Sequence, residues 1–195
     1  MNRTIIAVTT LVAVSIGHQA NAANVFYFTS SPTSWVGHGL TQTMTLTNGY
    51  SFSSHRYFSQ GAYTNDLSFG VTKSSDWWDL DFVGGSNTLV SAGLYADALR
   101  YPFNGTHPGL SFIGNGRGDN RLTGWFNVLE AVFDSGGQVQ RFAADFTQYD
   151  EQNTSRWNFG SFRYNSDVPI TTIPEPSTLA LGMIALAALS MHRCK

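Results

Sequence analysis

The stretch best suited to binding chemistry is the pair Trp77-Trp78, which aspartates flank at positions 76, 79 and 81. Because adjacent residues of a strand point to opposite faces, one indole is expected in the core and the other at the surface. An exposed tryptophan beside carboxylates offers a sugar ring an apolar face and hydrogen-bond acceptors. The alternative is plain packing, since large aromatic side chains fill the cores of small β domains. Trp77 and Trp78 are therefore candidate carbohydrate contacts, with core and rim packing as the competing interpretation.

Signatures of catalysis are missing from the sequence. The histidines between the terminal segments, His38, His55 and His107, lack metal-ligand spacing with one another or with a cysteine. Neither the serine-hydrolase elbow Gly-x-Ser-x-Gly nor the metalloprotease motif His-Glu-x-x-His occurs. The sequence therefore predicts a protein that is not an enzyme and needs no cofactor. An extracellular hydrolase or lyase acting on polysaccharide remains the alternative, because carboxylates can converge from distant strands.

The segments that would position these residues read as strands and turns. Short aromatic runs alternate with glycine, asparagine and serine, and Asn48-Gly49 is typical of a two-residue hairpin. A second hairpin is expected to turn at residues 134–137. Its first strand should place Trp125, Leu129 and Phe133 on one face and Phe126, Val128 and Val132 on the other. Residues 89–101 are also compatible with a short helix. The pattern predicts an all-β protein, a single antiparallel β-sandwich of jelly-roll type.

Composition restricts the partners of this domain. Residues 23–172 carry eight Lys and Arg against twelve Asp and Glu, a formal net charge of −4. A mildly acidic chain without a basic cluster argues against binding to nucleic acid or anionic lipid surfaces. The one cysteine, Cys194, lies near the carboxyl terminus, so the domain has no internal disulfide. A domain of about 150 residues buries about 68–70% of its unfolded surface and can rely on that burial.

The amino terminus has the pattern of a secretory signal peptide. Arg3 precedes an apolar stretch, and the small-residue site Ala20-Asn21-Ala22 predicts cleavage before Ala23. We therefore expect residues 1–22 to be a signal peptide that engages the Sec translocon.

The carboxyl terminus has a second apolar segment. Prolines punctuate residues 165–176, and the apolar run 177–191 would measure about 22 Å as a helix. That helix is shorter than a typical span of about 20 apolar residues. Arg193 and Lys195 follow it as a positive stop, which would leave the domain outside the inner membrane.

The sequence Pro174-Glu175-Pro176, the short apolar run and the basic end together resemble the PEP-CTERM sorting signal of Gram-negative bacteria, a tail that also carries an ice-binding label. The resemblance covers roughly the last 24 residues. It implies recognition by an exosortase, cleavage near the Pro-Glu-Pro, and transfer to the cell surface or its polysaccharide matrix. This tail has only Arg193 and Lys195 where related tails often carry a run of arginines.

The middle of the chain, most of residues 25–166, resembles an exported bacterial β-domain of unknown function. The resemblance rests on the stretches WVGHG, WWDLDF, RYPF, GNGRGDNRLTGWFNVLEAVFD, RFAADFTQYDE and GSFRYNS. That pattern has cysteines where Asp119 and Asp150 stand here. If those cysteines pair in relatives, the two aspartates should lie close together and repel. A raised pKa, Arg117 or Arg121, open solvent, or a calcium ion also held by Glu151 would relieve the repulsion.

These observations predict a signal peptide (1–22), a β-sandwich (23–168), a linker (169–172) and a sorting signal (173–195). We expect a non-enzymatic protein of the cell surface or extracellular matrix, associated with exopolysaccharide. Before processing it would be held at the inner membrane through its C-terminal helix alone. A calcium-stabilised structural module is a further alternative.

Overall fold

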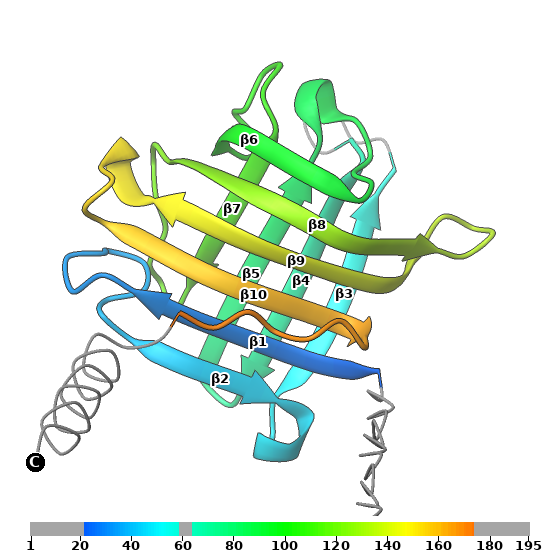
Figure 1. Ribbon diagram of the computed structural model, residues 1–195, viewed down its shortest axis with the longest axis horizontal. Coiled ribbons are helices and arrows are strands. Elements are labelled where there is room, and N and C mark those ends of the chain that lie inside the picture. The colour runs from blue at the N-terminus through cyan, green and yellow to red at the C-terminus, as the bar shows by residue number, and fades with distance from the viewer. Residues whose placement is uncertain (1–21, 59–63, 174–195) are drawn as a thin grey trace, which may run out of the picture.

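The protein is all-β, as predicted, and ten strands form one continuous sheet (Figure 1). The computed structural model describes residues 22–58 and 64–173. The strands are β1 (Ala23–Ser30), β2 (Thr41–Thr45), β3 (Ser51–Tyr57), β4 (Asp66–Lys73), β5 (Asp76–Val83), β6 (Gly93–Arg100), β7 (Gly109–Gly114), β8 (Thr123–Phe133), β9 (Val139–Tyr149) and β10 (Trp157–Ser166).

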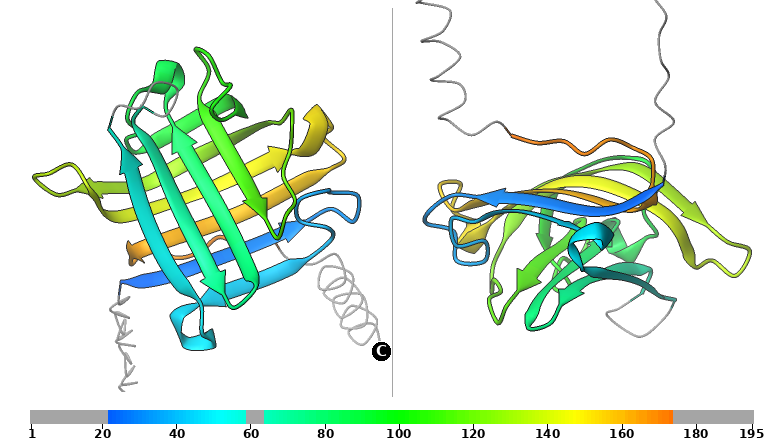
Figure 2. Two further views of the ribbon diagram at one scale, coloured as in Figure 1. Left: turned by 180° about the vertical axis from the view of Figure 1, so that it is seen from behind. Right: turned by 90° about the horizontal axis from the view of Figure 1, so that it is seen from below.

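The sheet folds over on itself into two packed layers, which confirms the sandwich. Its strand order is β2-β1-β10-β9-β8-β6-β7-β5-β4-β3. The first six strands form one layer and the last four the other, and the strands of the two layers cross steeply (Figures 1 and 2). The layers join where β6 pairs with β7 over only two residue pairs, Leu99 with Gly109 and Arg100 with Leu110. This pair is parallel, whereas the other pairs of neighbouring strands are antiparallel.

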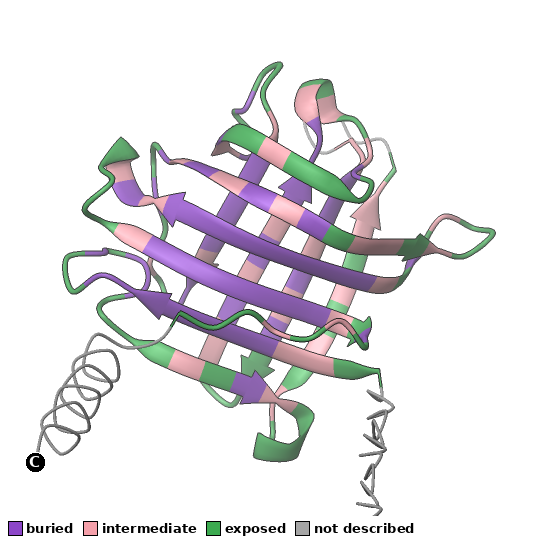
Figure 3. Cartoon of the chain, viewed as in Figure 1, coloured by how far each residue is buried: buried purple, intermediate pink, exposed green. Residues whose placement is uncertain are grey.

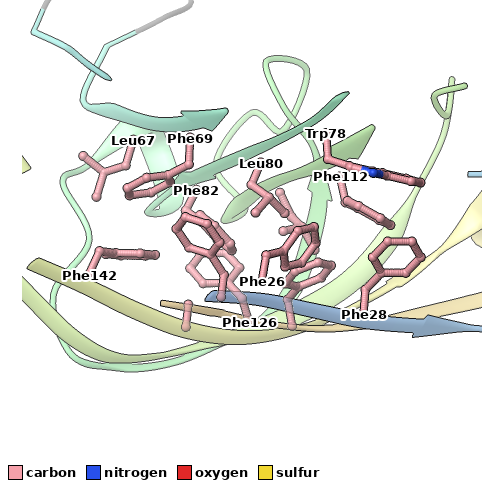
Figure 4. Packing of buried hydrophobic residues seen from close by; sticks show 14 of the residues in the cluster. Phe26, Phe28, Leu67, Phe69, Trp78, Leu80, Phe82, Phe112, Phe126 and Phe142 are labelled. Carbon is pink, nitrogen blue, oxygen red and sulfur yellow. The ribbon is translucent and has the colours of Figure 1, made fainter. Parts of the chain in front are cut away.

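The core between the layers is mainly phenylalanine (Figure 4), and buried positions run along the central strands of both layers (Figure 3). Inward positions of both layers supply rings that are fully shielded from solvent: Phe26, Phe28, Phe69, Phe82, Phe112, Phe126, Phe142, Phe146, Phe162 and Trp78. Phe112 stacks on Trp78 with ring centroids 5.2 Å apart. Each such ring buries about 150–250 Å². Apolar burial therefore stabilises the domain without a disulfide.

A buried glutamine replaces a neighbouring strand where β7 diverges from β6. The Gln148 Oε1 accepts a hydrogen bond from the Phe112 N–H (2.9 Å), and the Gln148 Nε2 donates to the Phe112 carbonyl (3.1 Å). Gln148 has no exposed surface, so these bonds satisfy backbone groups that would otherwise be buried without partners. The side chain thereby ties β9 to the opposite layer.

The hairpin predicted at Asn48-Gly49 is wrong. A short 3₁₀ turn, η1 (Leu46–Asn48), follows β2; Thr45 caps its start and Gly49, with φ of 89°, ends it. The chain then passes from β2 to β3, which are the two end strands of the sheet and are not paired with each other. Gly49 adopts the left-handed conformation that favours glycine, but here that conformation ends a helical turn and does not form a two-residue hairpin.

The predicted alternation of β8 is correct for its first half only. Phe126 and Val128 are buried, as expected, but a bulge shifts the pairing with β9 between Val128 and Glu130. A bulge inserts one residue and so exchanges the two faces of the strand. Beyond it Phe133 packs against the core and Val132 is 42% exposed, the reverse of the prediction.

Two other local predictions have opposite outcomes. The turn at residues 134–137 is confirmed, because Asp134 and Gln138 close the β8–β9 hairpin through the Asp134 N–H (2.9 Å). Residues 89–101 do not form a helix, and most of them belong to β6. The pairing of β6 with β8 outweighs the local helical pattern.

Residues 167–173 form a C-terminal strap across the outer face of the six-stranded layer (Figure 2). The buried Arg163 of β10 donates to the carbonyls of Val168 (3.0 Å) and Pro169 (2.7 Å). The Thr171 Oγ1 donates to Asp145 (2.6 Å), and its N–H donates to the Ser161 Oγ (2.9 Å). The segment predicted as a linker, 169–172, is therefore fastened to the sandwich.

Several predicted features lie outside the described residues. They are the signal peptide with Ala20, the motif Pro174-Glu175-Pro176, the apolar run 177–191, and Arg193 and Lys195. Within residues 22–58 and 64–173 there is no helix with the length and apolar character required to cross a membrane.

Candidate functional site

A hollow of about 810 Å³, which we name the aromatic groove, lies on the outer face of the six-stranded layer. It lies where β6, β8 and β9 run side by side (Figure 1). Its lining residues, which define the aromatic groove, are Leu94, Ala96, Asp97, Leu99, His107, Thr123, Gly124, Trp125, Tyr149 and Thr154. A hollow of this size falls in the range of small-molecule sites.

The two aromatic side chains of the groove come from neighbouring strands. Trp125 of β8 points outward because its neighbours Gly124 and Phe126 face the core. Thr123 of β8 pairs with Tyr149 of β9, and Tyr149 lines the same hollow as Trp125. A Cβ at Gly124 would lie 2.2 Å from the Thr147 carbonyl oxygen, so a larger residue would push β8 away from β9. Gly124 therefore permits the close pairing of β8 with β9 along the groove.

A bulge in β6 forms the opposite wall of the groove. The pairing of β6 with β8 shifts between Tyr95 and Ala98. Asp97, within the bulge, has φ of 54°. Tyr95 stacks on Phe126 in the core at 4.6 Å, while Leu94 is 68% exposed at the groove. The bulge thus places an apolar side chain and a carboxylate on the same outer surface.

The loop between β6 and β7 carries His107 to the groove. The Asn104 Nδ2 donates to the His107 carbonyl (2.7 Å), and the His107 N–H donates to the Asn104 carbonyl (3.0 Å). Asn104 is only 1% exposed. A buried asparagine therefore fixes the turn that presents the imidazole.

A network around Asp150 fixes the loop that carries Thr154. Asp150 opens the 3₁₀ turn η4 (Asp150–Gln152) and has no exposed surface. Five donors surround its carboxylate: Ser34 Oγ (2.7 Å), Trp35 N (2.7 Å), Val36 N (3.1 Å), Asn158 Nδ2 (2.6 Å) and Gln148 Nε2 (3.4 Å). The carboxylate thereby ties the loops after β1 and β9 together at the end of the groove.

Asp119 and Asp150 are close in space, and their carboxyl groups are hydrogen-bonded to each other. Burial, followed by the hydrogen bond to Asp150 and repulsion from Asp150, raises the pKa of Asp119 to about 8. At neutral pH the shared proton therefore resides on Asp119. Of the predicted ways to relieve this repulsion, a raised pKa is the one adopted.

The arginines considered for that role have other partners. The Arg117 Nε donates to the Val36 carbonyl (2.9 Å), and the Arg121 Nε lies 3.5 Å from the Glu151 carboxylate. Within the described ranges, no three acidic, histidine or cysteine side chains could share a metal ion. Asp119, Asp150 and Glu151, suggested as calcium ligands, do not form such a group, and protein donors already surround the Asp150 carboxylate.

Trp77 and Trp78 divide between core and surface, as predicted. Trp78 has no exposed surface, and its Nε1 donates to the Asp76 carboxylate (3.0 Å). Trp77 points to the outer face of the four-stranded layer, where Asp79 and Asp81 follow it on the same side of β5. Neither tryptophan belongs to the aromatic groove.

Sequence reasoning placed Trp125 on a strand but did not identify it as a site residue. The groove requires β6, β8 and β9 together with two loops, and no single stretch encodes that combination. One local signal was available: Trp125 and Thr123 lie on the face of β8 opposite to the apolar Phe126 and Val128.

Comparisons with protein-family models, with curated proteins and with solved structures find no match to this chain.

Proposed function

We propose that this protein is a non-enzymatic, exported protein of the cell surface or extracellular matrix that binds polysaccharide in the aromatic groove. The observation that carries the proposal is that Trp125 of β8 and Tyr149 of β9 both line a hollow of about 810 Å³. Sugar rings stack their C–H faces on aromatic rings, and aromatic side chains that line a groove provide such surfaces. Asp97, His107, Thr123 and Thr154 supply donors and acceptors for sugar hydroxyls.

The groove also continues toward a second, smaller hollow. A hollow of about 290 Å³ shares Tyr149 and Thr154 with it and adds Trp157, Phe159 and Ile173. Aromatic side chains thus follow one another across β8, β9 and β10. A series of this kind suits an extended chain of sugars better than a single small molecule.

Hydrolysis of polysaccharide in this groove is less well supported. Glycoside hydrolysis generally uses two carboxyl groups on either side of the bond that is cleaved. Among the described residues, Asp97 is the one carboxylate of the groove lining. Binding without cleavage is therefore the function that we propose for the groove.

We further propose that the chain is exported through its signal peptide and sorted through its Pro-Glu-Pro tail. The position of strand β1 supports the first cut, because the strand begins at Ala23, directly after the expected signal cleavage site. Cleavage at either point would leave the sandwich and its groove intact.

Binding to immobilised exopolysaccharides tests the groove. We expect Trp125→Ala to weaken binding by roughly tenfold or more, because loss of a central aromatic contact typically costs more than 1 kcal/mol. The matched controls are Trp77→Ala, on the outer face of the other layer, and Trp35→Ala, which is 56% exposed but outside the groove. Both controls should bind as the wild type does.

Equal binding by all three variants would contradict the groove assignment. Loss of binding only in Trp77→Ala would restore the site first suggested by the sequence. Release of reducing ends during the assay would instead favour the hydrolase alternative.

A further inference from the structure

A separate hollow, which we name the acidic cleft, lies on the outer face of the four-stranded layer, and carboxyl groups line it. It measures about 410 Å³ and lies over the outer face of β4, β5 and β7, between residues 100–102 and 118–120. Its lining residues are Tyr57, Asp66, Ser68, Asp81, Arg100, Tyr101, Pro102, Ser111, Ile113, Gly118, Asp119 and Asn120. Three carboxyl groups thus line one cleft, whereas the aromatic groove has a single carboxylate.

Asp66 is the least satisfied of these carboxyl groups. It begins β4 and is only 1% exposed, yet its Oδ1 has no hydrogen-bond partner among the described residues. A buried acceptor without a donor is costly, and native proteins leave few of them. An oxygen of this kind in the wall of a cleft is suited to a donor supplied by a ligand.

Asp81 lies on the same outer face, one strand away. It pairs in register with Ser68 of β4 and Ser111 of β7, and both hydroxyl groups donate to its carboxylate. Asp66 and Asp81 interact electrostatically. The serines orient Asp81 but supply no charge to balance it.

Among the described residues, none of the three carboxyl groups of the acidic cleft, Asp66, Asp81 and Asp119, forms a salt bridge. Arg100 also lines the cleft, but its guanidinium lies 4.9 Å from the ring centre of Phe103, which is 72% exposed. A cationic ligand would therefore meet carboxyl groups that lack a cationic partner.

The carboxyl groups of the cleft hold their protons more tightly than ordinary aspartates do. Burial, followed by repulsion from Asp81, raises the pKa of Asp66 to about 9. Burial raises the pKa of Asp81 to about 6, although its serine partners oppose that change. The free cleft thus retains a proton on Asp66 at neutral pH. A bound cation would favour the ionised form and release that proton.

A primary ammonium group fits this cleft better than a metal ion. Within the described part of the chain, no three carboxylates are close enough to hold a metal. An ammonium group instead donates up to three hydrogen bonds to separate acceptors. The rings of Tyr57 and Tyr101 in the lining add surfaces that attract a cation.

We propose that the acidic cleft binds a primary ammonium group, with Asp66 and Asp81 as its acceptors. The group can come from an amino sugar or from a lysine side chain. This site is independent of the aromatic groove, because it lies on the other layer and shares no residue with it.

Calorimetry of the purified protein near pH 7.5 tests the proposal with three probes: a glucosamine oligomer, its N-acetylated counterpart and a lysine oligomer. We expect saturable binding of the glucosamine oligomer and none of the N-acetylated one. Binding by the lysine oligomer as well would identify any primary amine as the ligand. Binding by glucosamine alone would identify an amino sugar.

Proton release provides a readout that needs no variant. With the lysine oligomer, whose amines are fully protonated at this pH, the heat of binding should change with the ionisation enthalpy of the buffer, because Asp66 releases its proton to the buffer. The titratable and charged groups around the cleft are Tyr57 and His55 of β3, Asp66 of β4, Asp79 and Asp81 of β5, Arg100 of β6, and Tyr101 and Asp119 of the loops. Asp66→Asn should abolish the proton release, and Asp81→Asn should weaken binding by tenfold or more.

Asp97→Asn and Trp125→Ala, both in the aromatic groove, should leave amine binding unchanged. This separates failure of the acidic cleft from failure of the groove. Three outcomes would overturn the proposal: equal binding of the N-acetylated oligomer, no binding of either amine, or amine binding that neither cleft variant alters.

Discussion

At the scale of single residues, burial determines the charge of several carboxyl groups. Asp119 and Asp66 lie in the folded protein with pKa values of about 8 and about 9, whereas both would ionise near pH 4 in the unfolded chain. A group whose pKa is raised by folding stabilises the protein below its unfolded pKa. That contribution is lost as the pH rises to the folded value. The stability of this protein should therefore fall between about pH 4 and pH 9.

Asp119→Asn tests this dependence. The amide is nearly isosteric, is neutral at every pH, and can donate to Asp150 in place of the carboxyl proton. We expect the variant to be more stable than the wild type at pH 8 by on the order of 2 kcal/mol, with a smaller difference at pH 4. Urea unfolding across this pH range measures the effect.

The exposed Asp97→Asn provides the control and should follow the wild-type curve. If Asp119→Asn destabilises the protein equally at pH 4 and pH 8, the carboxyl group is not protonated in the native state. Its hydrogen-bond geometry would then be what matters.

At the scale of elements, a buried ion pair fastens the C-terminal strap. The Arg163 Nη1 lies 2.9 Å from the Asp145 Oδ1, and the arginine side chain has no exposed surface. The same guanidinium donates to carbonyls of the strap. Removal of one partner from a buried pair leaves an uncompensated charge, which is more damaging than removal of both.

Arg163→Met should therefore destabilise the protein by about 3–5 kcal/mol in urea unfolding. It should also increase hydrogen exchange at the Thr171 amide, which donates a hydrogen bond to the Ser161 hydroxyl in the native strap. The double variant Asp145→Asn/Arg163→Met should recover part of the lost stability. A loss below about 1 kcal/mol with Thr171 still protected would show that the strap is held by other contacts.

At the scale of the whole molecule, the paired strands begin directly after the expected signal cleavage site. We predict that mass spectrometry of exported protein finds Ala23 as the first residue and a carboxyl end near Pro174–Pro176. The reason is that both cuts would fall outside the paired strands and the strap.

A variant that replaces Pro174-Glu175-Pro176 with alanines, but keeps the apolar run, provides the control. It should be exported and should keep its tail. Wild-type protein recovered with an intact tail would exclude cleavage at this site.

Local sequence patterns determined the fold class, the β8–β9 turn and the division of Trp77 from Trp78. These features depend on side-chain alternation with a period of two and on the conformational preferences of a few residues. The same local reasoning failed at Asn48-Gly49 and beyond Val128. In both cases the partner strand, and not the local pattern, decided the outcome.

Tertiary structure alone decided where the binding surfaces lie. The aromatic groove needs a bulge in β6, a tryptophan from β8 and loops closed by Asn104 and Asp150. The acidic cleft needs Asp66 and Asp81 on neighbouring strands beneath loops from distant parts of the chain. The physical reason is that a site is a set of long-range contacts. The sequence specifies each strand locally, but strand order and register decide which side chains meet.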